Sequence, residues 1–346
     1  MHSKFPRRKF LQTTSSLAGG LLLAGPTLHA APAIIRRYNK PDSKINGVQI
    51  GAITYSFRSM PDQSAEATLG YVTEAGISAI ELMGDPVESF AGAPKSTLDR
   101  GKIWGLMRRQ RDGELSEDET RELEEMRAQG EAYSKELAEW RAKVDMGKFR
   151  QLRRMYGDAG VSIYGYKPSA FGENSTDAEI NYGLKAAKTL GASHVTLEHP
   201  GNDAHTARLG KLAQPHGVRV AYHGHTQQTP DFWDTALQQS PANALNLDAG
   251  HYVAAGYDPR EIVRSKHASI SSMHTKDRTK PANGAKNLAW GEGDTPIGEL
   301  LSMMQRSKMN FPATIELEYD IPAGSDAVAE VARCLEYCRK SLSSRK

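Results

Sequence analysis

The chain contains 346 residues, of which 39% are hydrophobic and 25% are charged. These proportions are ordinary for a globular protein and exclude a disordered chain, a collagen-like chain and a small disulfide-stapled fold. Residues 1–30 hold four basic residues and no acidic one, so the remaining chain has a formal charge of −1 instead of the overall +3. A near-neutral protein lacks the positive field that nucleic-acid binding requires, so we expect no nucleic-acid partner.

The first thirty residues have the pattern of an export signal. Arg7 and Arg8 stand before an apolar run over about residues 17–24, and small residues follow around Ala30. This order defines a secretory signal, and the paired arginines are typical of the Tat route. The apolar run is shorter than the roughly twenty residues of a spanning helix, which disfavours an uncleaved membrane anchor. We expect a periplasmic protein without membrane association once the signal is removed, and a linker over 31–46.

The rest of the chain alternates strand and helix patterns. Runs rich in β-branched and apolar residues predict strands over 48–55, 78–83, 161–166, 194–198, 218–223, 244–248, 270–274 and 313–318. Helical patterns cover 64–75, 177–190, 204–216, 230–238, 258–264, 296–304 and 325–342. This alternation predicts a parallel sheet, and eight units favour a closed (β/α)₈ TIM barrel over an open sheet. No G-x-G-x-x-G follows the first strand, which disfavours a dinucleotide-binding fold. We expect a single barrel domain over 47–345.

Residues 98–155 interrupt the alternation with a charge-rich helical segment between the second and third strands. Ser116 and Glu119 have the spacing of a capping box, which marks the start of a helix. Apolar residues then recur at steps of three and four, as on one buried helix face: Leu123, Met126, Tyr133, Leu137, Trp140 and Val144. We expect a helical insertion packed on the barrel. A dimer contact or an active-site lid is the alternative, because insertions after barrel strands lie on the catalytic face.

Acidic and histidine residues stand at the ends of five consecutive predicted strands, where a parallel barrel places its active site. Four of them supply three carboxylates and one imidazole: Glu198, Asp248, His274 and Glu316. An oxygen-rich set with one nitrogen suits Mn²⁺, Mg²⁺ or Co²⁺ better than Zn²⁺ or Fe²⁺. We therefore expect a divalent metal ion at these strand ends. By strand alternation Glu318 faces the same way as Glu316 and is the alternative ligand.

Together these motifs resemble the xylose isomerase-like TIM barrels, the group of sugar phosphate isomerases and epimerases. The shared features are the fourth-strand glutamate, Leu-Asp-Ala-Gly-His over 247–251, His-Thr-Lys-Asp over 274–277, the Gly291-x-Gly293 loop and Ile-Glu-Leu-Glu over 315–318. The resemblance covers about residues 48–340, apart from the insertion. It implies the same four metal ligands.

The resemblance also implies roles for side chains around the metal. His251 is expected to orient the substrate, and His223 with His225 matches a His-x-His pair that many members carry on the fifth strand, facing the site. Glu81 and Lys276 are expected either to contact the substrate or to form structural ion pairs.

The expected chemistry follows from the metal. A divalent ion that holds a carbonyl oxygen and its neighbouring hydroxyl stabilises an enediolate, so a nearby carboxylate can remove the intervening proton. In the epimerases of this group two glutamate ligands act on opposite faces of the sugar, which gives the catalytic roles to Glu198 and Glu316. If the proton is returned to the enediolate, the protein is an isomerase or epimerase. Expelling an oxygen β to the carbanion makes it a lyase, for example on 3-keto-glycosides. A non-catalytic periplasmic carbohydrate-binding protein is the third alternative.

The predicted compartment narrows the substrate class. Phosphorylated sugars are intracellular metabolites, and the glycine-rich loop over 291–294 carries two acidic residues, unlike a phosphate-binding loop. We therefore expect a non-phosphorylated sugar or keto-sugar as the small-molecule partner. The sequence leaves open which sugar and which metal are used, and whether the chain forms a homo-oligomer.

Overall fold

In the computed structural model, which describes residues 40–343, eight parallel strands close into a barrel. They are β2 (Val48–Ile53), β3 (Ala79–Met83), β4 (Ser162–Lys167), β5 (His194–Glu198), β6 (Arg219–His223), β7 (Asn243–Asp248), β8 (Ile270–Thr275) and β11 (Ala313–Ile315). Each strand pairs with the next along the chain, and β11 pairs with β2 to close the ring. The predicted TIM barrel is therefore confirmed, while the predicted export signal lies outside the described residues.

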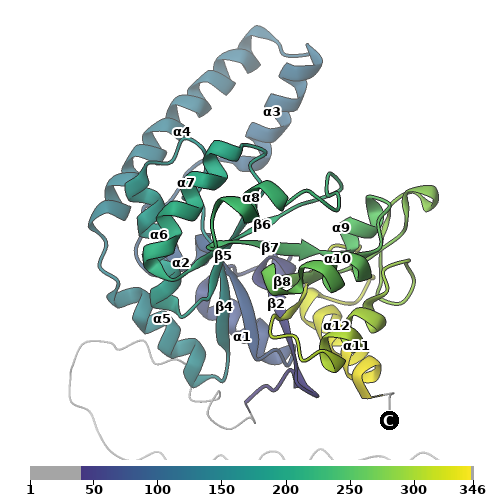
Figure 1. The fold of residues 1–346 in the computed structure, drawn as a ribbon. Helices are drawn as coiled ribbons and strands as arrows, with labels where there is room; N and C mark the ends of the chain where they lie inside the picture. The colour runs from purple at the N-terminus through teal and green to yellow at the C-terminus, as the bar shows by residue number, and fades with distance from the viewer. Residues whose placement is uncertain (1–39, 344–346) are drawn as a thin grey trace, which may run out of the picture. The chain divides into compact units, whose positions relative to one another are not determined.

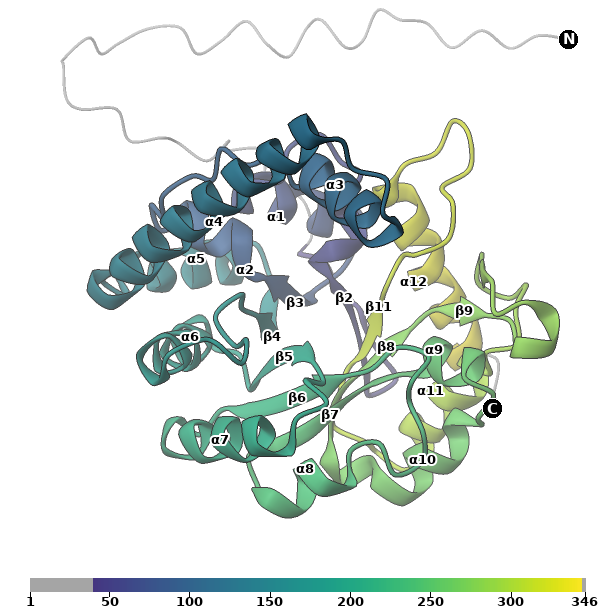
Figure 2. The ribbon, with the colours of Figure 1, turned by 90° about the horizontal axis from the view of Figure 1, so that it is seen from above.

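Helices surround the strands when the barrel is seen from above (Figure 2). They are α1 (Ala65–Glu74), α2 (Gly84–Phe90), α3 (Arg100–Asp112), α4 (Glu117–Lys143), α5 (Gly147–Asp158), α6 (Asp177–Leu190), α7 (Asp203–Ala213), α8 (Asp234–Gln239), α9 (Ala249–Ala254), α10 (Pro259–Lys266), α11 (Ile297–Arg306) and α12 (Ala327–Ser343). The main hydrophobic core packs the outer side of the strands against the inner faces of the surrounding helices, and α3 has no residue in this core. Within residues 40–343 no helix is long and apolar enough to cross a membrane.

The first described strand lies inside the segment predicted as a linker. Residues Lys44–Ile45 form β1, which turns at Asn46-Gly47 and pairs antiparallel with β2. The Ser43 side chain is fully buried and donates a hydrogen bond of 2.6 Å to the carbonyl of Ile50. A short second sheet joins β9 (Asp277–Arg278) to β10 (Asn287–Leu288) beyond the end of β8.

The predicted insertion contains α3, α4 and most of α5, and α3 and α4 form a hairpin that projects from the barrel (Figure 1). The capping box at Ser116 and Glu119 is present at the start of α4. Leu123 and Leu137 on the predicted apolar face of α4 are buried, and the other residues of that face are half-buried.

The inside of the barrel is polar below the strand ends. Tyr164 and Thr314 face each other there, with their hydroxyl oxygens 2.7 Å apart. Gly51 makes room for this pair, because a Cβ at that position would lie 2.4 Å from the Tyr164 hydroxyl oxygen. Four more buried polar side chains fill the same interior: Glu81, His194, Asn246 and Ser272. A polar interior can orient the side chains above it by hydrogen bonds, which an apolar interior cannot do.

Candidate metal centre and active site

Four buried side chains from neighbouring strands meet at the rim, the edge of the barrel at the carboxyl ends of the strands. His223 ends β6, Asp248 ends β7, His274 lies on β8 and Glu316 follows β11. Each offers a nitrogen or oxygen atom, and these atoms all lie within 4.8 Å of one another. We call these four residues the ligand group. It contains three of the four ligands predicted from the sequence. Its fourth member is His223, whereas the sequence predicted Glu198 as the fourth ligand.

Glu198 lies at the end of β5 with its side chain about half exposed, outside the ligand group. Its Oε1 atom lies 2.8 Å from the Nζ atom of Lys167, and its Oε2 atom lies 3.5 Å from Nε2 of His225. Burial raises the pKa of the Glu198 carboxyl, but His223 and Lys167 outweigh burial and keep that pKa below its usual value. The sequence analysis did not identify Lys167 as a candidate site residue, although it directly follows the third predicted strand.

Lys276 lies among three carboxylates at the rim. Its Nζ atom is 3.0 Å from Asp248 Oδ2, 2.8 Å from Glu316 Oε2 and 2.7 Å from Glu318 Oε2. Burial alone would raise the pKa of Glu316, but the Lys276 ammonium and His274 hold it well below its usual value. The pKa of Lys276 is raised in turn, because these carboxylates outweigh its burial. Lys276 therefore balances negative charge at the site, and both candidate glutamates after β11 reach it.

His274 is held between two carboxylates. Its Nδ1 atom lies 2.9 Å from Glu316 Oε2, and its Nε2 atom lies 2.9 Å from Glu81 Oε2. Burial disfavours the charged imidazole, but Glu81 and Glu316 outweigh it and raise the pKa of His274 to about 10. Glu81 is fully buried on β3 and forms an ion pair with this histidine.

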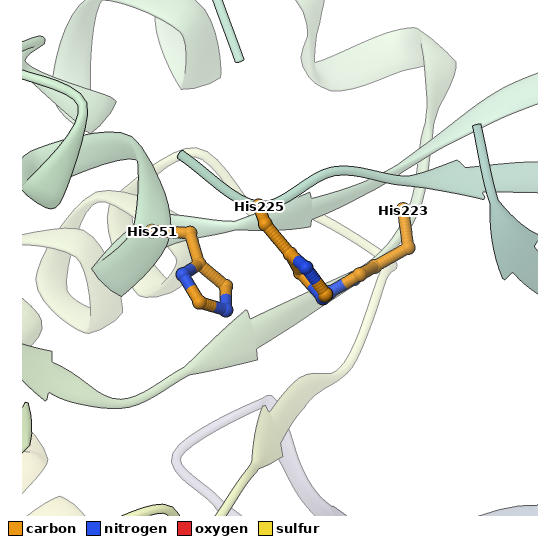
Figure 3. A group of neighbouring side chains, drawn as sticks. All are labelled: His223, His225 and His251. Atoms are coloured by element: carbon orange, nitrogen blue, oxygen red, sulfur yellow. The ribbon is translucent and has the colours of Figure 1, made fainter. Parts of the chain in front are cut away.

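Three histidines lie together at the rim, with a ring nitrogen of each within 4.8 Å of one in the others: His223, His225 and His251 (Figure 3). The guanidinium of Arg278 contacts Nδ1 of His251. Because a guanidinium only donates hydrogen bonds, Nδ1 must accept, and the proton of the neutral ring resides on Nε2. Burial lowers the pKa of His251 to about 3, which keeps the ring neutral. His251 therefore presents an N–H donor at the rim, as suits a group that orients a substrate oxygen.

The glycine-rich loop over 291–294 is tied to the barrel by Asp277. Its Oδ2 atom accepts hydrogen bonds from the backbone N–H groups of Gly291 and Gly293, at 2.7 and 3.0 Å, and its Oδ1 atom accepts one from Thr295 at 3.2 Å. A Cβ at residue 293 would lie 2.3 Å from Asp277 Oδ1, which explains the glycine there. These N–H groups are occupied and do not form a phosphate-binding loop.

The ligand group fits a divalent ion. Two carboxylates and two imidazoles are donors that first-row transition ions accept. Asp248 Oδ2 is buried and has no hydrogen-bond donor of good geometry, although Lys276 lies 3.0 Å away. Burial and His274 lower the pKa of His223, which favours the neutral imidazole, the form that binds metals.

Several solved structures share this architecture. A xylose isomerase domain protein from Planctomyces limnophilus superposes with a TM-score of 0.56 and 16% identity, covering 86% of this chain and 99% of that one. A D-psicose 3-epimerase from Clostridium cellulolyticum H10, solved with D-tagatose, gives a TM-score of 0.53 and 12% identity, covering 85% of this chain and 99% of that one. At these identities the likeness shows the fold alone.

Sequence comparison connects the chain to curated proteins and to a family. An inosose dehydratase from Bacillus thuringiensis is 26% identical over an alignment of 157 positions that covers 38% of this chain and 51% of that protein. An inosose dehydratase from Clostridium perfringens is 25% identical over an alignment of 154 positions that covers 39% of this chain and 49% of that protein. The chain thus spans about half the length of these relatives. The model of a family described as xylose isomerase-like TIM barrel matches residues 130–338. The chain belongs to the xylose isomerase-like TIM barrel family.

Proposed function

We propose that the protein is a metal-dependent isomerase or epimerase that acts on a non-phosphorylated sugar or keto-sugar. The observation that carries this proposal is a pair of ionised carboxylates on opposite sides of the rim. Glu198 ends β5 and Glu316 follows β11, and these strands are four places apart in either direction around the ring. Both groups have a pKa below the usual value. An enzyme that moves a proton from one face of a carbon to the other requires a base on each side of that carbon.

The ligand group would hold the metal through His223, Asp248, His274 and Glu316. A bound divalent ion supplies a Lewis acid that stabilises negative charge on a substrate carbonyl oxygen. Glu316 accepts the proton from the neighbouring carbon, and Glu198 serves the opposite face. The Nε2–H group of His251 donates a hydrogen bond to a substrate oxygen and fixes the carbon between the two bases.

One observation supports a substrate without phosphate. The backbone N–H groups of the 291–294 loop are bonded to Asp277 and are not free to bind a phosphate. Export by the signal predicted in residues 1–30 would agree with this choice, because phosphorylated sugars are intracellular.

A lyase is the second candidate, and the matches to inosose dehydratases favour it. The same base would break the C–H bond, and the electron pair would form a C=C bond while the C–O bond at the next carbon breaks. Lys167, paired with Glu198 at 2.8 Å, would give the departing oxygen its proton. The substrate would be a 3-keto-glycoside or a related β-oxygenated ketone.

Proton NMR in D₂O tests the proposal. The purified protein is supplied with Mn²⁺ and incubated with a panel of sugars and 3-keto-glycosides, alongside the Asp248→Asn variant and a chelated sample. Deuterium incorporation without bond cleavage, lost in both controls, is the expected result. Release of water or an aglycone would instead support the lyase. Binding of a sugar with neither reaction, across the whole panel, would contradict both and leave a carbohydrate-binding protein.

A further inference from the structure

A buried amide lies directly behind His223. The Nδ1 atom of His223 is 2.6 Å from Oδ1 of Asn246, which precedes Asp248 by two residues on β7. The Nδ2 atom of Asn246 donates to the Ser272 hydroxyl at 2.7 Å and lies 3.5 Å from Oε2 of Glu81. The Ser272 hydroxyl in turn lies 3.0 Å from Nε2 of His194. All of these side chains are almost completely inaccessible to solvent.

The neighbours of Asn246 determine which way its amide points. The Nδ2 atom of Asn246 faces Oε2 of Glu81, a carboxylate oxygen that also lies 2.9 Å from Nε2 of His274 and accepts hydrogen bonds. The NH₂ group of Asn246 must therefore face Glu81 and Ser272, since the reversed amide would place two acceptor oxygens against each other. Its Oδ1 atom then faces His223 and accepts the proton on Nδ1. The Nε2 atom of His223 is left with a lone pair, 3.9 Å from Asp248 Oδ2.

We propose that Asn246 is a positioning residue that fixes the tautomer and the ring orientation of His223, so that Nε2 is available as a metal ligand. This inference rests on the metal site of the proposed function and adds a residue to it. Glu81 does the same for His274, since its Oε2 atom lies 2.9 Å from Nε2 of that ring. Both histidines of the ligand group thus have a buried acceptor behind them, and the contact between Asn246 and Glu81 joins the two acceptors. Such partners orient a ligating histidine and raise its affinity for metal.

The tautomer can be measured in the parent protein without any substrate or metal. Long-range ¹H–¹⁵N correlation spectra distinguish an imidazole protonated on Nδ1 from one protonated on Nε2, and the His223→Gln variant identifies the signal. We expect His223 to be the Nδ1–H tautomer. An Nε2–H tautomer in the folded parent would overturn the proposal, whatever reaction the enzyme catalyses.

Metal affinity gives the second test. Asn246→Leu should weaken Mn²⁺ binding by about 10–100-fold, the range found when such partners are removed, as measured by competition with a chelator. Asn243→Leu is the matched control, because Asn243 is also buried on β7 but bonds the carbonyls of Thr206 and Ala236 on the other face of the strand. The control should bind Mn²⁺ like the parent. Equal Mn²⁺ affinity of the parent and the folded Asn246→Leu protein would overturn the proposal.

Discussion

In the proposed function Glu316 serves both as a metal ligand and as a base, and one substitution separates these roles. We predict that Glu316→Gln retains more bound Mn²⁺ than Asp248→Asn but loses proton exchange at the substrate carbon by about 10²–10⁴-fold. An amide oxygen can still coordinate a cation, yet it accepts no proton near neutral pH. Deuterium exchange followed by NMR, with metal content measured on the same samples, checks this. A metal-loaded glutamine variant that exchanges at the parent rate would show that the base lies elsewhere, with Glu198 and Glu318 as the next residues to test.

His223 should also set the metal preference. Replacing it with glutamate gives three carboxylates and one imidazole, a harder set of donors. We predict that His223→Glu shifts the ratio of Mg²⁺ to Co²⁺ affinity toward Mg²⁺ by at least about tenfold, because oxygen donors favour Mg²⁺ and nitrogen donors favour Co²⁺. Titrations with each ion check this. His225→Glu adds the same charge outside the ligand group, and a shift of equal size in that control would argue against a specific role of His223.

At this scale the sequence locates the site but does not rank the candidate ligands. Asp248, His274 and Glu316 can be predicted because strand ends in a parallel barrel converge. Glu198 and His223 are the last residues of adjacent strands and are paired with each other in register. Sequence position therefore cannot separate them, and only the side-chain packing shows that His223 turns inward. The roles of Lys167 and Asn246 could not be predicted from the sequence either, because a single polar residue in a strand forms no recognisable motif.

Helix α4 is attached to the barrel by a buried ion pair. The Nε and Nη2 atoms of Arg141 lie 2.9 and 3.0 Å from the two carboxylate oxygens of Glu88, and Nη2 also donates to Ser169 Oγ at 2.7 Å. The hydroxyl of Tyr182 donates to the same carboxylate at 3.1 Å. This arrangement connects the insertion to α2, to α6 and to the loop that follows Lys167.

We predict that Arg141→Met lowers the free energy of unfolding by about 3–5 kcal/mol, because it leaves the Glu88 carboxylate buried without a counter-ion. Urea denaturation measures this loss. Arg121→Met is the matched control on the same helix, since Arg121 pairs with Asp118 in a largely exposed position, and such pairs contribute about 0–1 kcal/mol. Equal losses in the two variants would contradict the structural role of Arg141.

Elements with local signals are predicted well, and those that depend on distant partners are not. Helix α6 begins and ends where the sequence places it, because Thr176 caps one end and Gly191 takes a left-handed conformation at the other. The last strand is predicted over 313–318 but ends at Ile315. The chain leaves the sheet there, where the backbone N–H of Leu317 bonds to Ser56 Oγ of a segment 261 residues away. The pairing of Arg141 with Glu88 is similarly distant in sequence and leaves no local pattern.

The whole molecule should be most stable near pH 6.5 when metal is removed by a chelator. Burial lowers the pKa of His194 to about 4 and that of His251 to about 3, from an ordinary value of 6.5. Below pH 6.5 the unfolded chain therefore binds more protons at these residues, and stability falls with decreasing pH. For His274, despite its burial, Glu81 and Glu316 raise the pKa to about 10. Above pH 6.5 the folded chain therefore binds more protons at His274 than the unfolded chain does. The stabilisation that comes from His274 decreases as the pH rises to about 10.

Chemical denaturation at several pH values checks this prediction. Each proton taken up or released changes the free energy of unfolding by at most about 1.4 kcal/mol per pH unit. The His274→Gln variant should lose most of the decline on the alkaline side while keeping the decline on the acidic side. A chelated parent protein that becomes more stable between pH 6.5 and 8.5 would contradict the charge assignments at the site.

In the proposed metal centre one divalent ion is held by His223, Asp248, His274 and Glu316, with Glu198 outside this set. Elemental analysis of the parent, His223→Ala and Glu198→Gln, loaded with Mn²⁺ and desalted side by side, tests it most directly. We predict stoichiometric metal in the parent and in Glu198→Gln, and strongly reduced metal in His223→Ala. Full occupancy in His223→Ala together with loss in Glu198→Gln would contradict the account and return the fourth position to Glu198.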